Sequence, residues 1–287
     1  MGSENNMKTV LELGEEDYGC RLDAVLARHI DSNSRNYWSK SIVNGRALVN
    51  GKSSKTSYKV KEGDKISVDI PETEVEPVEI PVIFENDDVM VIDKPLGMLS
   101  HSKGAFNPEF TVADFMKDKY RGEVNERSGI VHRLDRTTSG VMICAKNEEA
   151  AKFLQKQFST RKVRKSYLAL LTDMPQAKEA MIDVPIERNP KMPSTFRAGP
   201  NGKDAQTEFT VLTSTNVGVL VELRPRTGRT HQLRVHMAFM GLPIIGDEIY
   251  GGPQASRVML HASKLEITLP DSTRQTFEAK TPQEFQL

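Results

Sequence analysis

The amino-acid sequence predicts an α+β protein, with a mixed, largely antiparallel central sheet flanked by helices and a small N-terminal α/β module. Strand-like apolar runs outnumber segments of helical periodicity, and the two kinds do not alternate as βαβ units would. The charge also changes sign along the chain, from a basic segment at 18–70 to an acidic one at 71–88. With 287 residues, of which 38% are hydrophobic, the chain is long enough for one or two domains.

The N-terminal module begins with a predicted short strand and acidic turn at 8–17. Apolar residues at helical spacing predict a helix over 22–30 and a second one over 34–43, which ends at Asn44-Gly45, a left-handed cap signal. Asn50-Gly51 is the strongest short signal for a β-hairpin. The predicted strands of this module lie at 47–49, 58–60 and 65–68.

Basic side chains are concentrated in the same module. Residues 18–70 contain ten lysines and arginines against five acids, a net charge of +5. Two helices, a hairpin and a basic surface in so short a segment indicate a nucleic-acid-binding domain, since phosphates are contacted by clustered lysine and arginine. The candidate contacts are Arg35, Arg46 and Lys52. A solvated charged face on an ordinary subdomain is the alternative.

Residues 71–88 contain seven acids and no basic residue, and three prolines stiffen them. This composition predicts an extended linker that would repel RNA phosphate. We therefore place a nucleic-acid-binding domain at 18–70, the linker at 71–88 and a second domain at 89–287.

Apolar runs and caps predict the elements of this second domain. Thr230 is the expected cap of its last helix, and Gly241 the residue that closes it. Strands are predicted at 89–92, 141–145, 165–171, 203–211, 217–223 and 258–269, and helices at 111–120, 148–158 and 230–240.

The chemistry of the second domain is concentrated at Asp135. This carboxylate lies between Arg133 and Arg136, and the small residues that follow, up to Gly140, predict a tight loop before a buried strand. A carboxylate held on a rigid loop and kept ionised by guanidinium groups could act as a nucleophile. A structural salt bridge with Arg136 or Arg229 is the alternative.

Other catalytic signatures are absent from the sequence. It contains no serine nucleophile elbow, HExxH motif or phosphate-binding glycine loop, and we expect no cofactor. We expect no metal either, because the histidines at 132, 231, 236 and 261 lack metal-ligand spacing and are better explained as structural. Two basic stripes, 152–165 and 224–236, would bind phosphates, and Tyr167 next to the first is suited to stacking on a base.

The two cysteines, Cys20 and Cys144, form no CxxC pair and are too few for a disulfide framework. No apolar run approaches the ~18 residues that a membrane span needs. The first residues are polar and resemble no signal peptide; Met1-Gly2-Ser3 are interpreted as a cloning remnant. Together these features favour a cytoplasmic protein without a membrane partner.

The N-terminal module resembles the alpha-L RNA-binding domain, first known from a small-subunit ribosomal protein. Trp38 stands where that family usually has an aliphatic or polar residue. The resemblance rests on Arg21-Leu22-Asp23, Ser34-Arg35, Val43 to Lys52 and Tyr58 to Asp64.

The chain from residue 18 to about 285 resembles the pseudouridine synthases of the RluA class, the branch that contains RluC and RluD. Several ordered motifs in one chain make chance agreement very improbable. The segment 99–105 departs from the more hydrophobic Val-Val-His-Pro type of that class. The matching stretches are Lys94-Pro95-Leu96-Gly97, His132 to Gly140, Lys165-Ser166-Tyr167, Gly228 to His236 and Leu260-His261-Ala262.

The resemblance implies a cofactor-free isomerisation of uridine in RNA, with Asp135 as nucleophile at C1′ or C6 or as an aid to departure of uracil. Arg229 would pair with Asp135, although phosphate binding is its alternative role. Tyr167 would stack on the flipped uracil, a strand-core tyrosine being the alternative. Of the expected RNA contacts, Arg133 would enter the space left by the flipped nucleotide. Arg136 and Leu260 are the others, with Leu260 as a wall of the base pocket.

Large structured RNA is the expected substrate, because an RNA-binding module accompanies the second domain. We expect large-subunit ribosomal RNA, with transfer RNA as the alternative, and a monomer. A catalytically silent RNA-binding assembly factor would show the same basic stripes, but it would not need Asp135, Tyr167 and Arg229 together. A base deaminase would need zinc ligands and a glutamate signature that the sequence lacks.

Overall fold

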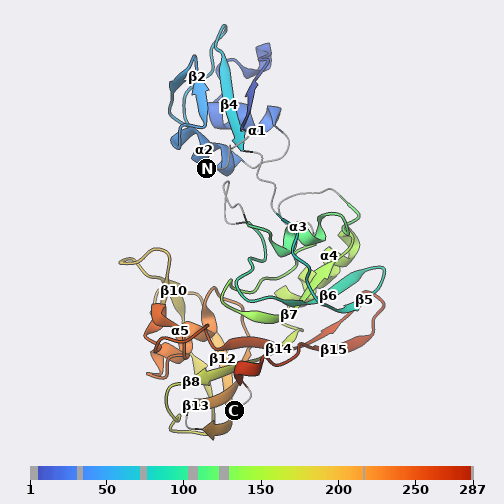
Figure 1. The fold of residues 1–287 in the computed structure, drawn as a ribbon, viewed down its shortest axis with the longest axis vertical. Coiled ribbons are helices and arrows are strands. Elements are labelled where there is room, and N and C mark those ends of the chain that lie inside the picture. Colours follow the sequence, from blue (N-terminus) through green and yellow to red (C-terminus); the bar gives the residue numbers. More distant parts are fainter. Residues whose placement is uncertain are drawn as a thin grey trace. The chain divides into compact units, whose positions relative to one another are not determined.

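The computed structural model describes residues 6–30, 35–71, 76–102, 109–122, 129–215 and 217–285 (Figure 1). The chain divides into two compact units. The first comprises residues 1–77 with 101–110, and the second comprises 78–100 with 111–287. The division at residue 77 falls inside the segment that we predicted as a linker.

The first unit packs two helices, α1 (Leu22–His29) and α2 (Arg35–Val43), on a small antiparallel sheet. Its core includes the fully buried Trp38, Leu22 and Ile66. The turn that joins residues 47–49 to residues 52–53 has positive φ at both Asn50 and Gly51, as a tight hairpin turn requires. The sheet contains β1 (Asn6–Val10), β4 (Ile66–Pro71), β2 (Ala47–Val49) and β3 (Lys52–Ser53), in that order.

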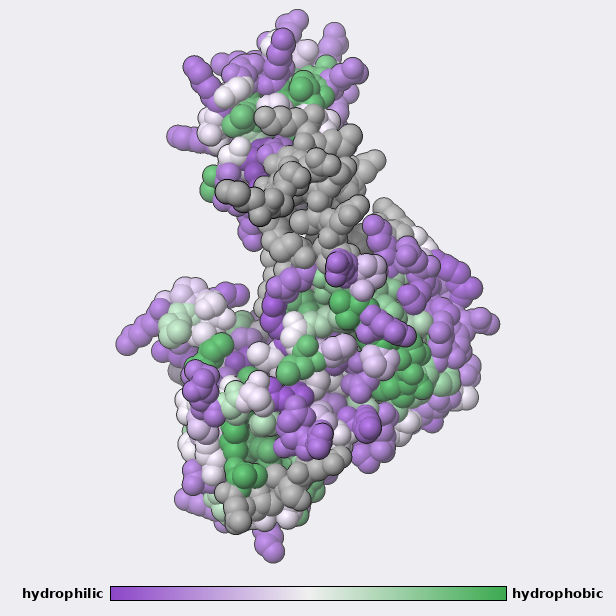
Figure 2. Space-filling model, viewed as in Figure 1, coloured by the Kyte–Doolittle hydropathy of each residue, from purple (hydrophilic) through white to green (hydrophobic). Residues whose placement is uncertain are grey.

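One predicted strand of the first unit, at 58–60, is wrong. Lys59 forms only an isolated bridge with Arg21, and residues 61–65 turn directly into β4. Figure 2 shows hydrophilic side chains over much of the face of this unit that is in view.

The second unit is built on a nine-stranded mixed sheet. Among its described residues, only the strands β7 (Ser139–Ala145) and β14 (Leu260–Thr268) pair in parallel, so the predicted α+β class is confirmed. The described part of this unit also contains the helices α3 (Val112–Lys117), α4 (Glu148–Ser159) and α5 (Gln232–Phe239) and the 3-10 turns η2 (Glu248–Tyr250) and η3 (Gln283–Phe285). The strand order is β5 (Val82–Glu85), β6 (Val89–Lys94), β7 (Ser139–Ala145), β14 (Leu260–Thr268), β8 (Arg164–Leu171), β13 (Gly218–Pro225), β12 (Gln206–Thr215) and β9 (Glu179–Asp183), with β15 (Arg274–Glu278) also on β14. A separate hairpin joins β10 (Ile186–Arg188) and β11 (Phe196–Ala198), and a short turn, η1 (Glu15–Asp17), belongs to the first unit.

Strand β5 lies within the predicted linker and corrects that prediction. It pairs with β6, and the ring of Phe84 lies 5.2 Å from that of Phe277 on β15. The sequence did not predict this strand, because acidic residues flank Val82-Ile83-Phe84. An edge strand is paired on one side only and tolerates charged flanks. The second half of the linker therefore belongs to the larger unit.

The middle of the large sheet brings distant segments together. The parallel pairing sets Gly140 of β7 beside Ala262 of β14, and Ala262 also pairs with Tyr167 of β8. Gly140 has φ +113°, and a Cβ there would lie 2.2 Å from the carbonyl oxygen of Ala262. Only glycine allows so close an approach. The loop before β7 is thus fixed beside Tyr167.

Candidate active site

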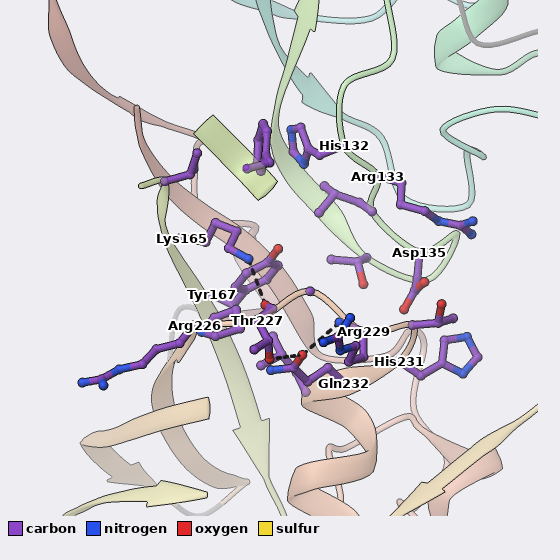
Figure 3. A pocket seen from close by; sticks show the side chains of 18 of the residues that line it. His132, Arg133, Asp135, Lys165, Tyr167, Arg226, Thr227, Arg229, His231 and Gln232 are labelled. Carbon is purple, nitrogen blue, oxygen red and sulfur yellow. Dashed lines mark hydrogen bonds between the residues drawn. The ribbon is translucent and has the colours of Figure 1, made fainter. Parts of the chain in front are cut away.

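A cavity of about 550 Å³ opens on the second unit beside this junction (Figure 3). Asp135 comes from the loop before β7, Tyr167 from β8, and Arg229 from the loop between β13 and α5. Arg133 and Leu260 also line the cavity, so it brings together five of the residues predicted for the site. Arg136 does not line it.

The loop that carries Asp135 is fastened on both sides. The amide of Thr138 donates to the carbonyl of Asp135 at 3.0 Å, which closes a turn. The amide of Gly97 donates to the carbonyl of Arg136 at 2.9 Å, and the buried Ser100 bonds the backbone of Leu134. These contacts place the partly buried carboxylate of Asp135 on a rigid support.

The predicted ion pair between Asp135 and Arg229 is not present. Within the described residues, Asp135 lies in no salt bridge. The Nε of Arg229 donates instead to the backbone carbonyl of Asp204 at 2.9 Å. The two side chains face the same cavity from opposite loops (Figure 3). This acceptor is a backbone carbonyl from another segment, which the sequence pattern does not indicate.

Gln232 organises the loop that carries Arg229, a role that the sequence did not predict. Its side-chain oxygen accepts hydrogen bonds from the hydroxyl of Thr227, at 2.7 Å, and the amide of Arg229, at 2.9 Å. Its amide group donates to the carbonyl of Gln206 at 2.9 Å. The predicted cap, Thr230, is wrong: α5 begins after His231, whose φ is +57° and whose side chain makes no capping hydrogen bond.

Tyr167 and Lys165 project into the cavity from β8. They are two residues apart on a strand, so their side chains share a face. Burial and, secondarily, the charge of Asp135 raise the pKa of Tyr167, which keeps its phenol protonated. Burial lowers the pKa of Lys165 to about 8. Its ammonium donates to the carbonyl of Thr227 at 3.0 Å.

His132 has a structural role in the cavity wall. Its Nε2 accepts a hydrogen bond from the amide of Ile143 at 3.1 Å, and its ring stacks on Phe158 at 4.5 Å between centroids. Burial, with a smaller contribution from Lys165, lowers its pKa to about 3. The imidazole is therefore neutral at physiological pH.

A buried ion pair supports the floor of the cavity and was also missed. The guanidinium of Arg234 donates to both carboxylate oxygens of Asp247, at 2.7 and 2.6 Å. It also lies 4.9 Å from the ring centroid of Tyr250, whose hydroxyl bonds His231 at 2.8 Å. The segment Ile245 to Gly251 contained no periodic signal that would have indicated this pairing.

The remaining predicted residues lie on the first unit. Arg35 is exposed and forms an ion pair with Asp23 at 3.3 Å; Arg46 is half-buried and Lys52 is exposed. No group of three or more histidine, cysteine or acidic side chains among the described residues could hold a metal ion. In the same part of the chain, no helix is both long and apolar enough to cross a membrane.

Two solved human structures resemble this one. RNA pseudouridylate synthase domain containing 1 has a TM-score of 0.59 and 30% identity over 74% of this chain and 87% of its own. RNA pseudouridylate synthase domain containing 4 has a TM-score of 0.58 and 28% identity over 71% and 90%. The fold is thus that of the pseudouridine synthase class.

Sequence comparison leads to the same class. The model of the RNA pseudouridylate synthase family matches residues 88–239. An uncharacterized RNA pseudouridine synthase of Aquifex aeolicus is 38% identical over 86% of this chain and 82% of its own. The ribosomal large subunit pseudouridine synthase D of Xanthomonas campestris is 36% identical over 88% of this chain and 83% of its own. The protein of the same name from Borreliella burgdorferi is 34% identical over 96% of this chain and 90% of its own.

The chain belongs to the RNA pseudouridylate synthase family, and it is an RNA pseudouridine synthase, an isomerase. The predicted resemblance is confirmed. Because this family consists of enzymes, the alternative of a catalytically silent assembly factor is not favoured.

Proposed function

We propose that this enzyme converts uridine to pseudouridine in large-subunit ribosomal RNA, with Asp135 as its nucleophile. The observation that carries the proposal is the position of Asp135, which is fastened by backbone hydrogen bonds and lines one cavity with Tyr167. The relatives named ribosomal large subunit pseudouridine synthase D support the choice of RNA. Transfer RNA is the second candidate.

The cavity suits a single flipped nucleotide. Its volume of about 550 Å³ lies within the range of small-molecule sites. A uridine inside a helix must leave the stack to reach Asp135, which costs a few kcal/mol. Arg133 is exposed at the cavity edge and would fill the vacated space, while Leu260 would contact the base.

The reaction conserves all atoms of the nucleotide. The C1′–N1 bond breaks and its electron pair leaves with uracil; the base turns, C5 bonds to C1′, C5 loses its proton and N1 gains one. Asp135 takes part by attack on C1′, by attack on C6, or by assisting departure of the base. Tyr167 stacks on the turning base and keeps its phenolic proton. Arg229, held at Asp204, binds a phosphate of the flipped nucleotide.

The first unit supplies additional RNA affinity in this proposal. Its predicted contacts are Arg35, Arg46 and Lys52 on a small two-helix fold. The part of the predicted linker that precedes the second unit, residues 71–77, connects the RNA-binding and catalytic domains in this proposal. We further propose that the enzyme acts as a cytoplasmic monomer.

The test is conversion of an unmodified transcript of large-subunit ribosomal RNA, with pseudouridine mapped along it. Asp135→Asn should abolish product while RNA affinity stays within about twofold, since only the reacting group changes. Cells that lack the protein should lose pseudouridine at the same positions. Wild-type conversion rates in Asp135→Asn would contradict the role of Asp135, and product only in transfer RNA would contradict the substrate.

A further inference from the structure

Lys165 is a cation that faces the reaction chamber and that the proposed mechanism does not yet use. It lines the same cavity as Asp135 and Tyr167, and Figure 3 shows its ammonium beside the Tyr167 ring. A Cβ on Gly228 would lie 3.9 Å from the lysine nitrogen, so the nitrogen reaches the loop that leads to Arg229. It therefore lies at the inner wall of the cavity.

The ammonium has fewer partners than its chemistry calls for. A lysine carries three N–H donors, but in the described part of the chain the nitrogen of Lys165 makes one hydrogen bond, to the carbonyl of Thr227. It forms no ion pair among those residues. Two of its donors are therefore available to a ligand in the cavity that Lys165 lines. The depressed pKa of Lys165 reflects its burial.

We propose that Lys165 binds a carbonyl oxygen of the flipped uracil and stabilises the negative charge that the base acquires during the reaction. This inference rests on the proposed isomerisation. When the C1′–N1 bond breaks, its electron pair leaves with the base, and the charge spreads over N1, O2 and O4. Attack at C6 instead places negative charge on O4. Lys165 keeps its proton and acts as a donor on either route.

Its surroundings favour the base over a phosphate as the ligand. Arg133, Arg161 and Arg226 line the cavity with exposed side chains, where a phosphate backbone in solvent would pass. Lys165 is less exposed and adjoins Tyr167, the stacking residue. His132 beside it is neutral and offers no competing charge. A donor beside the stacked ring is placed to reach the edge of the base.

The first test measures single-turnover rate and RNA affinity for Lys165→Met on a large-subunit ribosomal RNA transcript. The rate should fall about 100- to 1,000-fold, as when one oxyanion donor is removed. RNA affinity should change less than about threefold, and Lys165→Arg should recover part of the rate. Lys178→Met, an exposed lysine outside the cavity, is the matched control and should behave as wild type. Weaker binding with an unchanged rate at saturation would overturn the proposal.

The second test changes the acceptor instead of the donor. Transcripts with 2-thiouridine or 4-thiouridine replace one carbonyl oxygen by sulfur, a weaker acceptor. Sulfur at the contacted oxygen should slow the wild-type enzyme and have little further effect on Lys165→Met. Sulfur at the other oxygen should affect both enzymes equally.

Equal responses of wild type and Lys165→Met to both sulfur substitutions would overturn the role of Lys165, and would leave a structural role at Thr227. Failure of the proposed function would look different. In that case the wild-type enzyme would form no pseudouridine in the oxygen-containing transcript, and both proposals would fall.

Discussion

The hydroxyl of Ser100 makes two hydrogen bonds to the backbone of Leu134, donating to its carbonyl at 2.9 Å and accepting from its amide at 3.1 Å. Both residues are buried, and Asp135 follows directly. Ser100 belongs to the segment where the sequence departs from the more hydrophobic type of its class. Ser100 thus lies against the loop of the proposed nucleophile, and its side chain supplies a contact that fixes that loop.

Ser100→Ala should lower both stability and activity. Removing the hydroxyl leaves a buried amide and carbonyl of Leu134 without their partner, at about 1–3 kcal/mol in unfolding free energy. Because Asp135 follows Leu134, the single-turnover rate should also fall, by roughly 10-fold for about 1.4 kcal/mol of lost positioning. Denaturant unfolding and single-turnover kinetics measure the two effects. Ser100→Thr, which retains the hydroxyl, should recover most of the rate; wild-type kinetics in Ser100→Ala would contradict the positioning role.

Gly140→Ala should destabilise the second unit by more than about 3 kcal/mol. The new Cβ would meet the carbonyl oxygen of Ala262 at 2.2 Å, in addition to the strain of φ +113°. The matched control is Gly241→Ala, where φ is +73° but no atom lies within 4 Å, so only backbone strain of about 1–2 kcal/mol is expected. Equal losses in the two variants, measured by denaturant unfolding, would show that the close approach of β7 and β14 is not what requires glycine.

The sequence predicts those features that depend on neighbouring residues, and it fails for features that depend on contacts between distant segments. The strand after Asp135, the hairpin at Asn50-Gly51 and the helix after Asn147 follow from neighbouring residues, and the structure contains all three. Short motifs were also enough to predict Asp135 and Tyr167 as residues of the site, and both line the cavity. Where each signal lies within one segment, propensity and tertiary structure agree.

Contacts between distant segments could not be predicted. The carbonyl of Asp204 holds Arg229, and Ser100 fastens Leu134, across 25 and 34 residues respectively. Hydrogen bonds to backbone atoms leave no compositional signature, since every residue carries a carbonyl and almost every one an amide. The same reason explains why the role of Gln232, whose side chain accepts a hydrogen bond from the amide of Arg229, could not be predicted.

The neutral His132 should make stability depend on pH below about 6.5. Its pKa is near the ordinary 6.5 in the unfolded chain and about 3 in the folded one, so the unfolded state binds the extra proton first. Stability from this group is complete above pH 6.5 and is lost as pH falls, by up to about 1.4 kcal/mol per pH unit. His132→Gln retains an acceptor for the amide of Ile143 but does not titrate. The difference in unfolding free energy between wild type and variant should therefore shrink from pH 7 to pH 4; a constant difference would contradict the buried neutral state.

Arg234 and Asp247 should be far more costly to separate than to replace together. Both side chains are at most 3% exposed, and their two hydrogen bonds are 2.7 and 2.6 Å long. Arg234→Met leaves the Asp247 carboxylate buried without its partner, so we expect a loss of about 3–5 kcal/mol in unfolding free energy. Arg234→Met combined with Asp247→Leu removes both charges and should recover most of that loss. Activity should follow stability only in part, because Arg234 belongs to α5 and also lines the cavity. A double variant that is stable but slow, with unchanged RNA affinity, would separate that positioning role from folding; a double variant no more stable than Arg234→Met would show that the pair is not what the single substitution disrupts.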